Sequence, residues 1–590
     1  MKWIAIMLGA ALFPVQLNAE TKLKDLNGFF PFHVPDNLES WEERSELLKR
    51  RVLIANGLFP MPEKTPLNAV VHGKVERPGF TVEKVYFESV PGFHVTGLLF
   101  RPANREPGVR YPAVLSPHGH GGRLQDHGAK GILQQIEIGA EKFADSGRFP
   151  KVARCANLAR LGCVTLLFDM IGYADNQQLS NEVGHRLKKR RPQMEGNDSW
   201  GFFSPAAEMR LQSIFGLQTW NAIRAIDFLE SLPDVDPARI GVTGGSGGGT
   251  QSIMVCAIDD RPVVAFPNGM VSSSMQGGCT CENASLLRIG TGNVELAALF
   301  APKPQGMTAA DDWTKEMLVP GKGFPELQKL YSLYGKPENV FCADLTRFRH
   351  NYNVVTREAM YEWFNKYLSL GHKTPPKEQD FAALTPEEHA VYDDQHPRPE
   401  GGEAFEKKLT RWLADESDKQ IATMPKEERG QLIEEAWQTI VGIDDPAPAA
   451  KPPLDVDGVV TIAIDIAPRK PEQTPVVSNP REIAAYTHGY NHSFFAQEAR
   501  KLYSQIKQAK EAGFFVEVNA AEGSEAVALA AIAASGYNSV SRLRMNNDKF
   551  RFADITSYRD PDFVPGAVKY GDLPGLIETV NRLGTKIELK

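Results

Sequence analysis

Along residues 81–368, hydrophobic positions recur every second residue in some segments and at helical spacing in others. Alternating runs at 81–88 and 94–100, separated by Val90-Pro91-Gly92, predict a β-hairpin. Short apolar runs bounded by turn residues predict buried strands at 111–116, 164–168 and 263–267. Apolar residues at helical spacing predict helices at 40–55, 155–161, 216–229 and 357–368. Strands that alternate with helices in this way favour an α/β fold with a mostly parallel central sheet.

The pattern changes after residue 373. Residues 374–456 are charged and rich in proline, and they predict a connector with helices near 404–414 and 427–440. Strand and helix patterns then return, with strands at 459–466 and 514–518 and helices at 493–512 and 526–534. The length of 590 residues also favours more than one domain.

Composition and the N-terminal residues limit the partners and the compartment. A net charge of -7 gives no reason to expect nucleic acid or an anionic membrane as a partner. Lys2 precedes an apolar stretch that ends near Val15, and Ala19 offers a small residue at a cleavage site. Residues 1–19 therefore predict a cleavable signal peptide and a secreted or periplasmic protein without a membrane span. The oligomeric state stays open.

The six cysteines all lie between residues 155 and 342. In an exported chain they allow disulfides, and buried thiols are the alternative. Cys279-Thr280-Cys281 is suggestive of a metal site, but no histidine or second cysteine pair stands at the usual zinc spacing. The sequence therefore predicts neither a metal nor an organic cofactor.

A glycine cluster at 244–248, Gly-Gly-Ser-Gly-Gly, follows an apolar run and precedes a helical pattern. This G-x-S-x-G arrangement is typical of a nucleophile elbow, a sharp turn that exposes a serine hydroxyl above a sheet. We therefore predict Ser246 as a nucleophile and the amide of Gly247 as an oxyanion donor. The alternative is a glycine-rich turn that only happens to contain a serine.

A second glycine-rich turn, His118-Gly119-His120-Gly121-Gly122, directly follows the predicted strand at 111–116. In serine hydrolases with an elbow, the second oxyanion donor comes from such a turn. Gly119 and His120 are the candidates. A tight turn with incidental histidines is the other interpretation.

A serine nucleophile also needs a histidine base and an acid that orients it, in the order Ser, Asp or Glu, His. His350 is the candidate base. Asp312 and Asp311 occupy the loop where the acid belongs, Glu282 is a rival, and Asp344 is a fourth candidate that we expect on the surface.

Three motifs together resemble secreted bacterial α/β-hydrolases of the acetyl-xylan-esterase-like or glucuronoyl-esterase-like group: residues 275–283, Asp311-Asp-Trp-Thr314, and His350-Asn-Tyr-Asn353 with Arg357 and Tyr361. The resemblance covers about residues 90–370. It implies an α/β-hydrolase fold, Asp312 as the acid, and an esterified carbohydrate as substrate. Glucuronoyl esterases carry an arginine directly after the nucleophile, where this chain has Gly247. The resemblance therefore favours deacetylation, with glucuronoyl-type methyl ester cleavage as the alternative.

The C-terminal region is interpreted as a smaller, degenerate α/β-hydrolase-like domain. Laying residues 516–524 over 240–248 puts Glu522 where Ser246 stands. The predicted organisation is then a signal peptide at 1–19, a catalytic domain at 20–373, a connector at 374–456 and a degenerate domain at 457–590.

Two further functions share some of these features. A prolyl-oligopeptidase-like serine peptidase has the same fold and triad order, but the segment before residue 90 is too short for its propeller domain. A non-catalytic binding protein fits poorly with a complete Ser, Asp and His set. Aromatic residues such as Trp200, Phe202 and Trp313 would suit stacking on a sugar ring.

Overall fold

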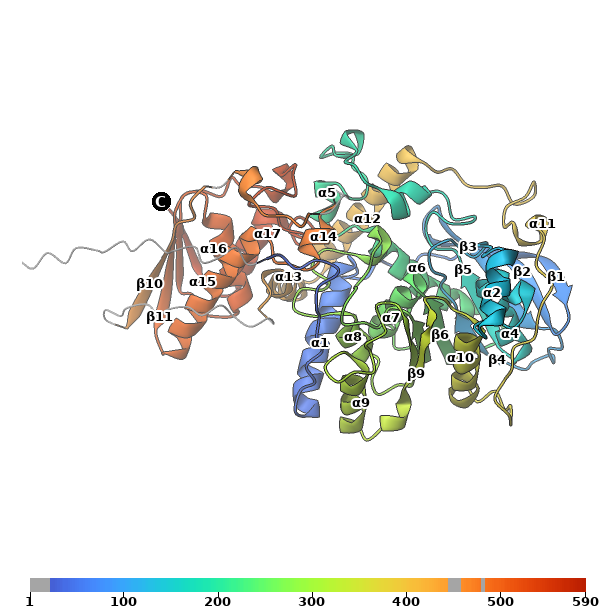
Figure 1. The fold of residues 1–590 in the computed structure, drawn as a ribbon. Helices are drawn as coiled ribbons and strands as arrows, with labels where there is room; N and C mark the ends of the chain where they lie inside the picture. The colour runs from blue at the N-terminus through green and yellow to red at the C-terminus, as the bar shows by residue number, and fades with distance from the viewer. Residues whose placement is uncertain (1–21, 444–457, 469, 479–482) are drawn as a thin grey trace, which may run out of the picture.

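A computed structural model of the chain describes residues 22–443, 458–468, 470–478 and 483–590 (Figure 1). The predicted signal peptide at 1–19 lies outside these residues. Among the helices that are described, none combines the length and the apolar character needed to cross a bilayer.

The larger sheet has nine strands in the order β1-β2-β3-β5-β4-β6-β7-β8-β9. Strands β1, β2 and β3 join one edge in antiparallel fashion, and all pairs from β5 to β9 are parallel. Their bounds are β1 Val70–Arg77, β2 Phe80–Val90, β3 Phe93–Pro102, β4 Tyr111–Leu115, β5 Val164–Phe168, β6 Val235–Gly245, β7 Pro262–Asn268, β8 Gln305–Asp311 and β9 Val340–Arg349. The crossover order β5-β4-β6, with a sharp strand-to-helix turn after β6, is that of the α/β-hydrolase fold, and the predicted fold class is confirmed.

Helices cover both faces of this sheet. Alternate residues of one strand point to opposite faces, so Ala113 and Leu115 of β4 pack in one apolar cluster and Val114 in another. The first cluster contains α6 (Ile214–Ser231), and the second contains residues of α4 (Pro150–Arg160) and α10 (Val354–Tyr367). The other helices of this region are α1 Leu38–Ala55, α2 Ala129–Glu137, α3 Ala144–Arg148, α5 Pro205–Glu208, α7 Gly247–Ile258, α8 Asn293–Ala298 and α9 Phe324–Leu333.

A second sheet lies in the C-terminal region. Its four parallel strands follow chain order and are β10 Val459–Ile464, β11 Phe515–Ala520, β12 Arg542–Met545 and β13 Lys586–Leu589. Its helices are α14 Ala485–His488, α15 Phe494–Glu511, α16 Glu525–Ser535 and α17 Asp572–Arg582. The predicted elements at 459–466, 493–512, 514–518 and 526–534 are therefore present. Strands β1, β8, β9, β12 and β13 were not predicted from the sequence.

The segment between the two sheets contributes to the core. It holds α11 (Pro386–His389), α12 (Glu403–Thr423) and α13 (Lys426–Val441). Trp437 of α13 is fully buried against Phe495 and Phe552 of the C-terminal region. The same apolar cluster includes Leu48 and Val52 of α1. Figure 1 shows α13 between α1 and the C-terminal helices, so the predicted connector carries core contacts as well as linking two regions.

The turn after β11 differs from the expected copy of the elbow. The residue with a left-handed backbone there is Gly523, at φ +82°, and Glu522 has no such conformation. Ser524 is buried, and its hydroxyl accepts a hydrogen bond from the Ile466 amide at 3.0 Å. The overlay of Glu522 on Ser246 is thus not reproduced by the backbone. The descent of this region from an α/β-hydrolase domain, and the domain boundaries, remain predictions.

Candidate active site

Ser246 forms the turn between β6 and α7. Its backbone has φ 55° and ψ -127°, a combination that is strained for a residue with a side chain. The Ser246 amide donates to the Asn268 carbonyl at 3.0 Å, which ties the turn to the end of β7. Gly247 is the first residue of α7, so its N–H has no partner within the helix. Within the described chain, the Ser246 hydroxyl therefore lies beside an amide that has no hydrogen-bond partner, at a helix N-terminus.

The turn after β4 packs directly on this elbow. A Cβ on Gly119 would lie 2.5 Å from the Gly245 carbonyl oxygen and 2.9 Å from the Ser246 Cβ, and a Cβ on Gly248 would collide with the Pro117 carbonyl. Only glycine permits such an approach of the two chains. The Gly119 amide makes no hydrogen bond within the part of the chain that the structure describes. The two glycine-rich segments are thus brought together, as the motif pairing predicts.

Asp312 and His350 form a hydrogen-bonded pair. His350 follows β9 and its Nδ1 lies 2.7 Å from Asp312 Oδ2, just after β8. The other oxygen of Asp312 accepts from the Thr314 amide and hydroxyl, each at 2.6 Å. Burial alone raises the pKa of Asp312, but the hydrogen bonds from His350 and Thr314 outweigh it and lower that pKa. The carboxylate is therefore ionised and holds His350 with Nδ1 protonated and Nε2 free to accept a proton.

The His350 ring lies against the elbow through Gly269. A Cβ at this position would stand 2.7 Å from His350 Cε1 and 3.8 Å from the Ser246 amide nitrogen. Trp313 also packs on the imidazole, with ring centroids 4.5 Å apart, and its indole N–H donates to the Gly269 carbonyl. His350 is thus fixed beside Ser246.

The three other acid candidates lie elsewhere. Asp311 is exposed at the end of β8 and pairs with Lys315 at 2.7 Å. Asp344 is on β9, where it accepts from Thr346 near the surface. Glu282 is buried, and it accepts from the Cys279 amide at 3.0 Å and the Thr250 hydroxyl at 3.3 Å. Among these candidates, only Asp312 is hydrogen-bonded to His350 within the described chain.

Two residues that the sequence did not single out shape the oxyanion turn. Lys151 of α4 donates to the carbonyls of His120 and Gly122 and to Gln125 at 2.7–2.9 Å. Burial lowers the pKa of Lys151 to about 7. His118 is buried, with Nδ1 bonded to the Gly119 carbonyl at 2.8 Å and Nε2 accepting from the Met170 amide at 3.0 Å. These bonds occupy the carbonyl side of the turn.

Residues 176–213 form an irregular segment between β5 and α6, here called the insertion, and its Gly184 carbonyl accepts from the Thr280 hydroxyl at 2.8 Å. Trp200 and Phe202 are buried, so they are not available to stack on a sugar. His185 lies in η1 (Glu182–Arg186), a short helix of this insertion. Trp313, which contacts His350, is the remaining aromatic residue of the three that we considered.

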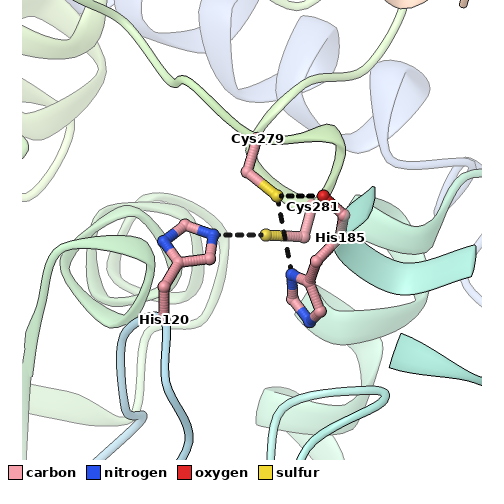
Figure 2. Close-up of side chains that lie close together, drawn as sticks. All are labelled: His120, His185, Cys279 and Cys281. Carbon is pink, nitrogen blue, oxygen red and sulfur yellow. Dashed lines mark hydrogen bonds between the residues drawn. The ribbon is translucent and has the colours of Figure 1, made fainter. Parts of the chain in front are cut away.

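Cys279 and Cys281 have histidine neighbours in the fold that their spacing along the sequence does not reveal. His120 of the oxyanion turn and His185 of the insertion join them, and one nitrogen or sulfur atom from each of the four lies within 4.8 Å of all the others (Figure 2). The pKa of Cys279 is lowered because its sulfur accepts a hydrogen bond from Cys281 and lies beside both imidazoles. The spacing rule failed because these partners are 94 and 161 residues away along the chain.

Comparisons with known proteins give matches of low identity. No family model matches the chain. It is 23% identical over 341 residues to the Bacillus subtilis protein named "Putative hydrolase YtaP", which covers 54% of this chain and 99% of that protein.

Among solved structures the chain is similar to Methylesterase BT1017, with 23% identity and a TM-score of 0.43 over 64% of this chain and 72% of that chain. It is also similar to an acetyl xylan esterase from Paenibacillus sp. R4, with 16% identity and a TM-score of 0.32 over 58% and 98% of the two chains. It is similar as well to a glucuronoyl esterase from Caldicellulosiruptor kristjansonii, with 18% identity and a TM-score of 0.35 over 63% of this chain and 97% of that chain.

Proposed function

We propose that this protein is a serine carboxylic-ester hydrolase that works through an acyl-enzyme. The observation that supports this most is the Asp312–His350 pair at 2.7 Å, held beside a strained serine at the start of a helix. A structural histidine needs neither the strained serine nor the free amides beside it. Ser246, His350 and Asp312 together have the arrangement of a nucleophile, a base and an acid.

The residues have distinct roles in this proposal. Ser246 Oγ attacks the ester carbonyl while His350 Nε2 accepts its proton and passes it to the leaving alcohol. Asp312 keeps His350 in the required tautomer and stabilises the imidazolium. The amides of Gly247 and of Gly119 or His120 donate to the oxyanion. A water molecule, deprotonated by His350, then releases the acid and restores Ser246.

For the substrate we propose an acetylated polysaccharide or oligosaccharide met outside the cytoplasm. The support is the three-motif resemblance to carbohydrate esterases, together with the signal-peptide pattern at 1–19. Gly247 in place of an arginine speaks against a glucuronoyl ester.

The first test is hydrolysis of p-nitrophenyl acetate by the full-length protein and by Ser246→Ala. We expect the variant to lose at least about 10⁴-fold in kcat, because the remaining groups supply only part of the rate enhancement. Ser524→Ala is the matched control, since Ser524 also follows a glycine between a strand and a helix, and it should keep the turnover and the labelling by a fluorophosphonate. A folded protein that neither turns over nor reacts with the fluorophosphonate would contradict the proposed mechanism.

The substrate is tested separately. Acetate release from acetylated xylan is compared with methanol release from a glucuronate methyl ester, and we expect the acetyl ester to be preferred. The reverse preference would leave the serine mechanism in place and replace the substrate.

A further inference from the structure

Four potential metal ligands meet beside the elbow, and the proposed hydrolysis uses none of their side chains. They come from three separate parts of the chain: the turn after β4 supplies His120, the insertion supplies His185, and η3 (Thr280–Glu282) with the residue before it supplies Cys279 and Cys281. His185, Cys279 and Cys281 are buried and His120 is half-buried. Figure 2 shows the two sulfur atoms and one nitrogen of each ring directed toward a common point.

The distances match those of a tetrahedral site. Zinc lies about 2.3 Å from sulfur and about 2.05 Å from nitrogen, so a tetrahedral angle puts the two ligand atoms about 3.6 Å apart. Here Cys281 Sγ is 3.4 Å from His120 Nε2, and Cys279 Sγ is 3.5 Å from His185 Nδ1. These two distances are those of a tetrahedral site, and all pairs of the four ligand atoms lie within 4.8 Å.

The surroundings of His185 prepare its ring for a metal. Its Nε2 lies 2.7 Å from the Ile171 carbonyl oxygen, which can only accept, so Nε2 carries the proton. Nδ1 is then unprotonated, and its lone pair faces Cys279. A backbone carbonyl on the second nitrogen is the usual outer partner of a metal-bound histidine, because it fixes both tautomer and ring orientation.

We propose that His120, His185, Cys279 and Cys281 bind one Zn²⁺ ion that has a structural role. Two thiolates and two imidazoles in tetrahedral arrangement favour zinc over harder divalent cations. Four protein ligands leave no open position for a substrate, as in structural zinc sites.

The ion would join three segments that are far apart along the sequence. A Cβ on Gly247 would lie 3.5 Å from His120 Cε1 and 3.7 Å from Glu282 Oε1, so the site borders the predicted oxyanion donors. Zinc would hold the oxyanion turn, the insertion and the loop of Cys279 in one fixed arrangement. This inference concerns folding and metal content, so it stands or falls independently of the proposed esterase activity.

The test begins with the metal content of full-length protein purified without a metal-affinity tag or chelator. Mass spectrometry of the metals should find about one zinc per chain. The double variant Cys279→Ser/Cys281→Ser should lose it, and Cys342→Ser, which changes a cysteine on β9 outside the cluster, should retain it. Zinc that persists in the double variant would be bound elsewhere and would overturn the proposal.

A second measurement does not depend on a variant that folds. The wild-type protein, freed of metal with a chelator, is titrated with Co²⁺. We expect the thiolate-to-cobalt absorption band and the intense visible bands of tetrahedral cobalt to saturate at one equivalent, and Zn²⁺ to abolish them. Absence of zinc from the purified protein together with absence of these bands would overturn the proposal.

Thiol counting covers the remaining alternative, a disulfide between the two cysteines. Protein that is unfolded without reductant in the presence of a chelator should show all six thiols. A count of four, with Cys279 and Cys281 linked, would overturn the zinc site.

Discussion

At the residue scale, the choice between two adjacent aspartates shows how the site is built. Asp311 is the last residue of β8, and its side chain points to solvent and Lys315. Asp312 begins the following turn, and its side chain points inward to Thr314 and His350. Because neighbouring residues of an extended chain face opposite sides, a single position decides which carboxylate reaches the histidine.

We therefore expect Asp312→Asn to lower kcat for p-nitrophenyl acetate by about 10⁴-fold, since the amide would favour the wrong tautomer of His350. Asp311→Asn is the matched control and should stay within a factor of a few of the wild type. Equal losses in both variants, or a loss only in Asp311→Asn, would show that the acid is assigned wrongly.

At the element scale, the short helix α5 connects the two regions through a buried acid. Glu208 is 4% exposed, and its carboxylate accepts from the Ser285 hydroxyl at 2.7 Å. Its backbone carbonyl accepts from the Gly566 amide of the C-terminal region at 3.2 Å. Burial raises the pKa of Glu208 to about 7, because within the described residues only the hydrogen bond from Ser285 acts to lower it.

This pKa predicts a pH dependence of stability. Well below pH 4.5, Glu208 is protonated in both the folded and the unfolded state. Between pH 4.5 and 7 the unfolded chain loses the proton first, so stability falls as the pH rises, by roughly 3 kcal/mol in all. Glu208→Gln, which is neutral throughout, should remove this part of the loss.

Urea unfolding at pH 4.5 and pH 8 measures the effect. When the pH is raised from 4.5 to 8, the free energy of unfolding of Glu208→Gln should increase relative to that of the wild type. Glu428→Gln, at an exposed position of α13, should follow the wild type. Identical pH dependence in all three proteins would refute the role of Glu208.

At the scale of the whole molecule, one apolar cluster extends through both regions. It contains residues of α1 and α7 beside the larger sheet, and residues of α13, α15 and α16 beside the smaller one. Neither region can lose these contacts without exposing apolar surface of the other. We therefore expect the two regions to unfold together.

Trp437→Ala tests this expectation. Removal of a buried indole should destabilise the protein by about 3–5 kcal/mol and shift one calorimetric transition as a whole. Phe515→Ala is the control, because Phe515 is 65% exposed on β11, and it should cost no more than about 0.5 kcal/mol. Two separate transitions, of which Trp437→Ala moves only one, would contradict a shared core.

The sequence by itself determined the local features of this protein. The strand, glycines and helix around Ser246, the hairpin of β2 and β3 and the alternation that makes a parallel sheet all follow from short-range periodicity and backbone sterics. The candidate acid and base could be narrowed to a few residues in the same way, because the order of elements in an α/β sheet limits where they stand.

Only the tertiary structure decided which distant side chains meet. It pairs Asp312 with His350, directs Lys151 to the oxyanion turn and brings His120 and His185 to Cys279 and Cys281. These contacts depend on the strand order β5-β4-β6 and on how the insertion folds back over the sheet, and no local pattern encodes either. The local pattern also placed α13 in a connector, because it does not show that the buried side chains of α13 belong to the core.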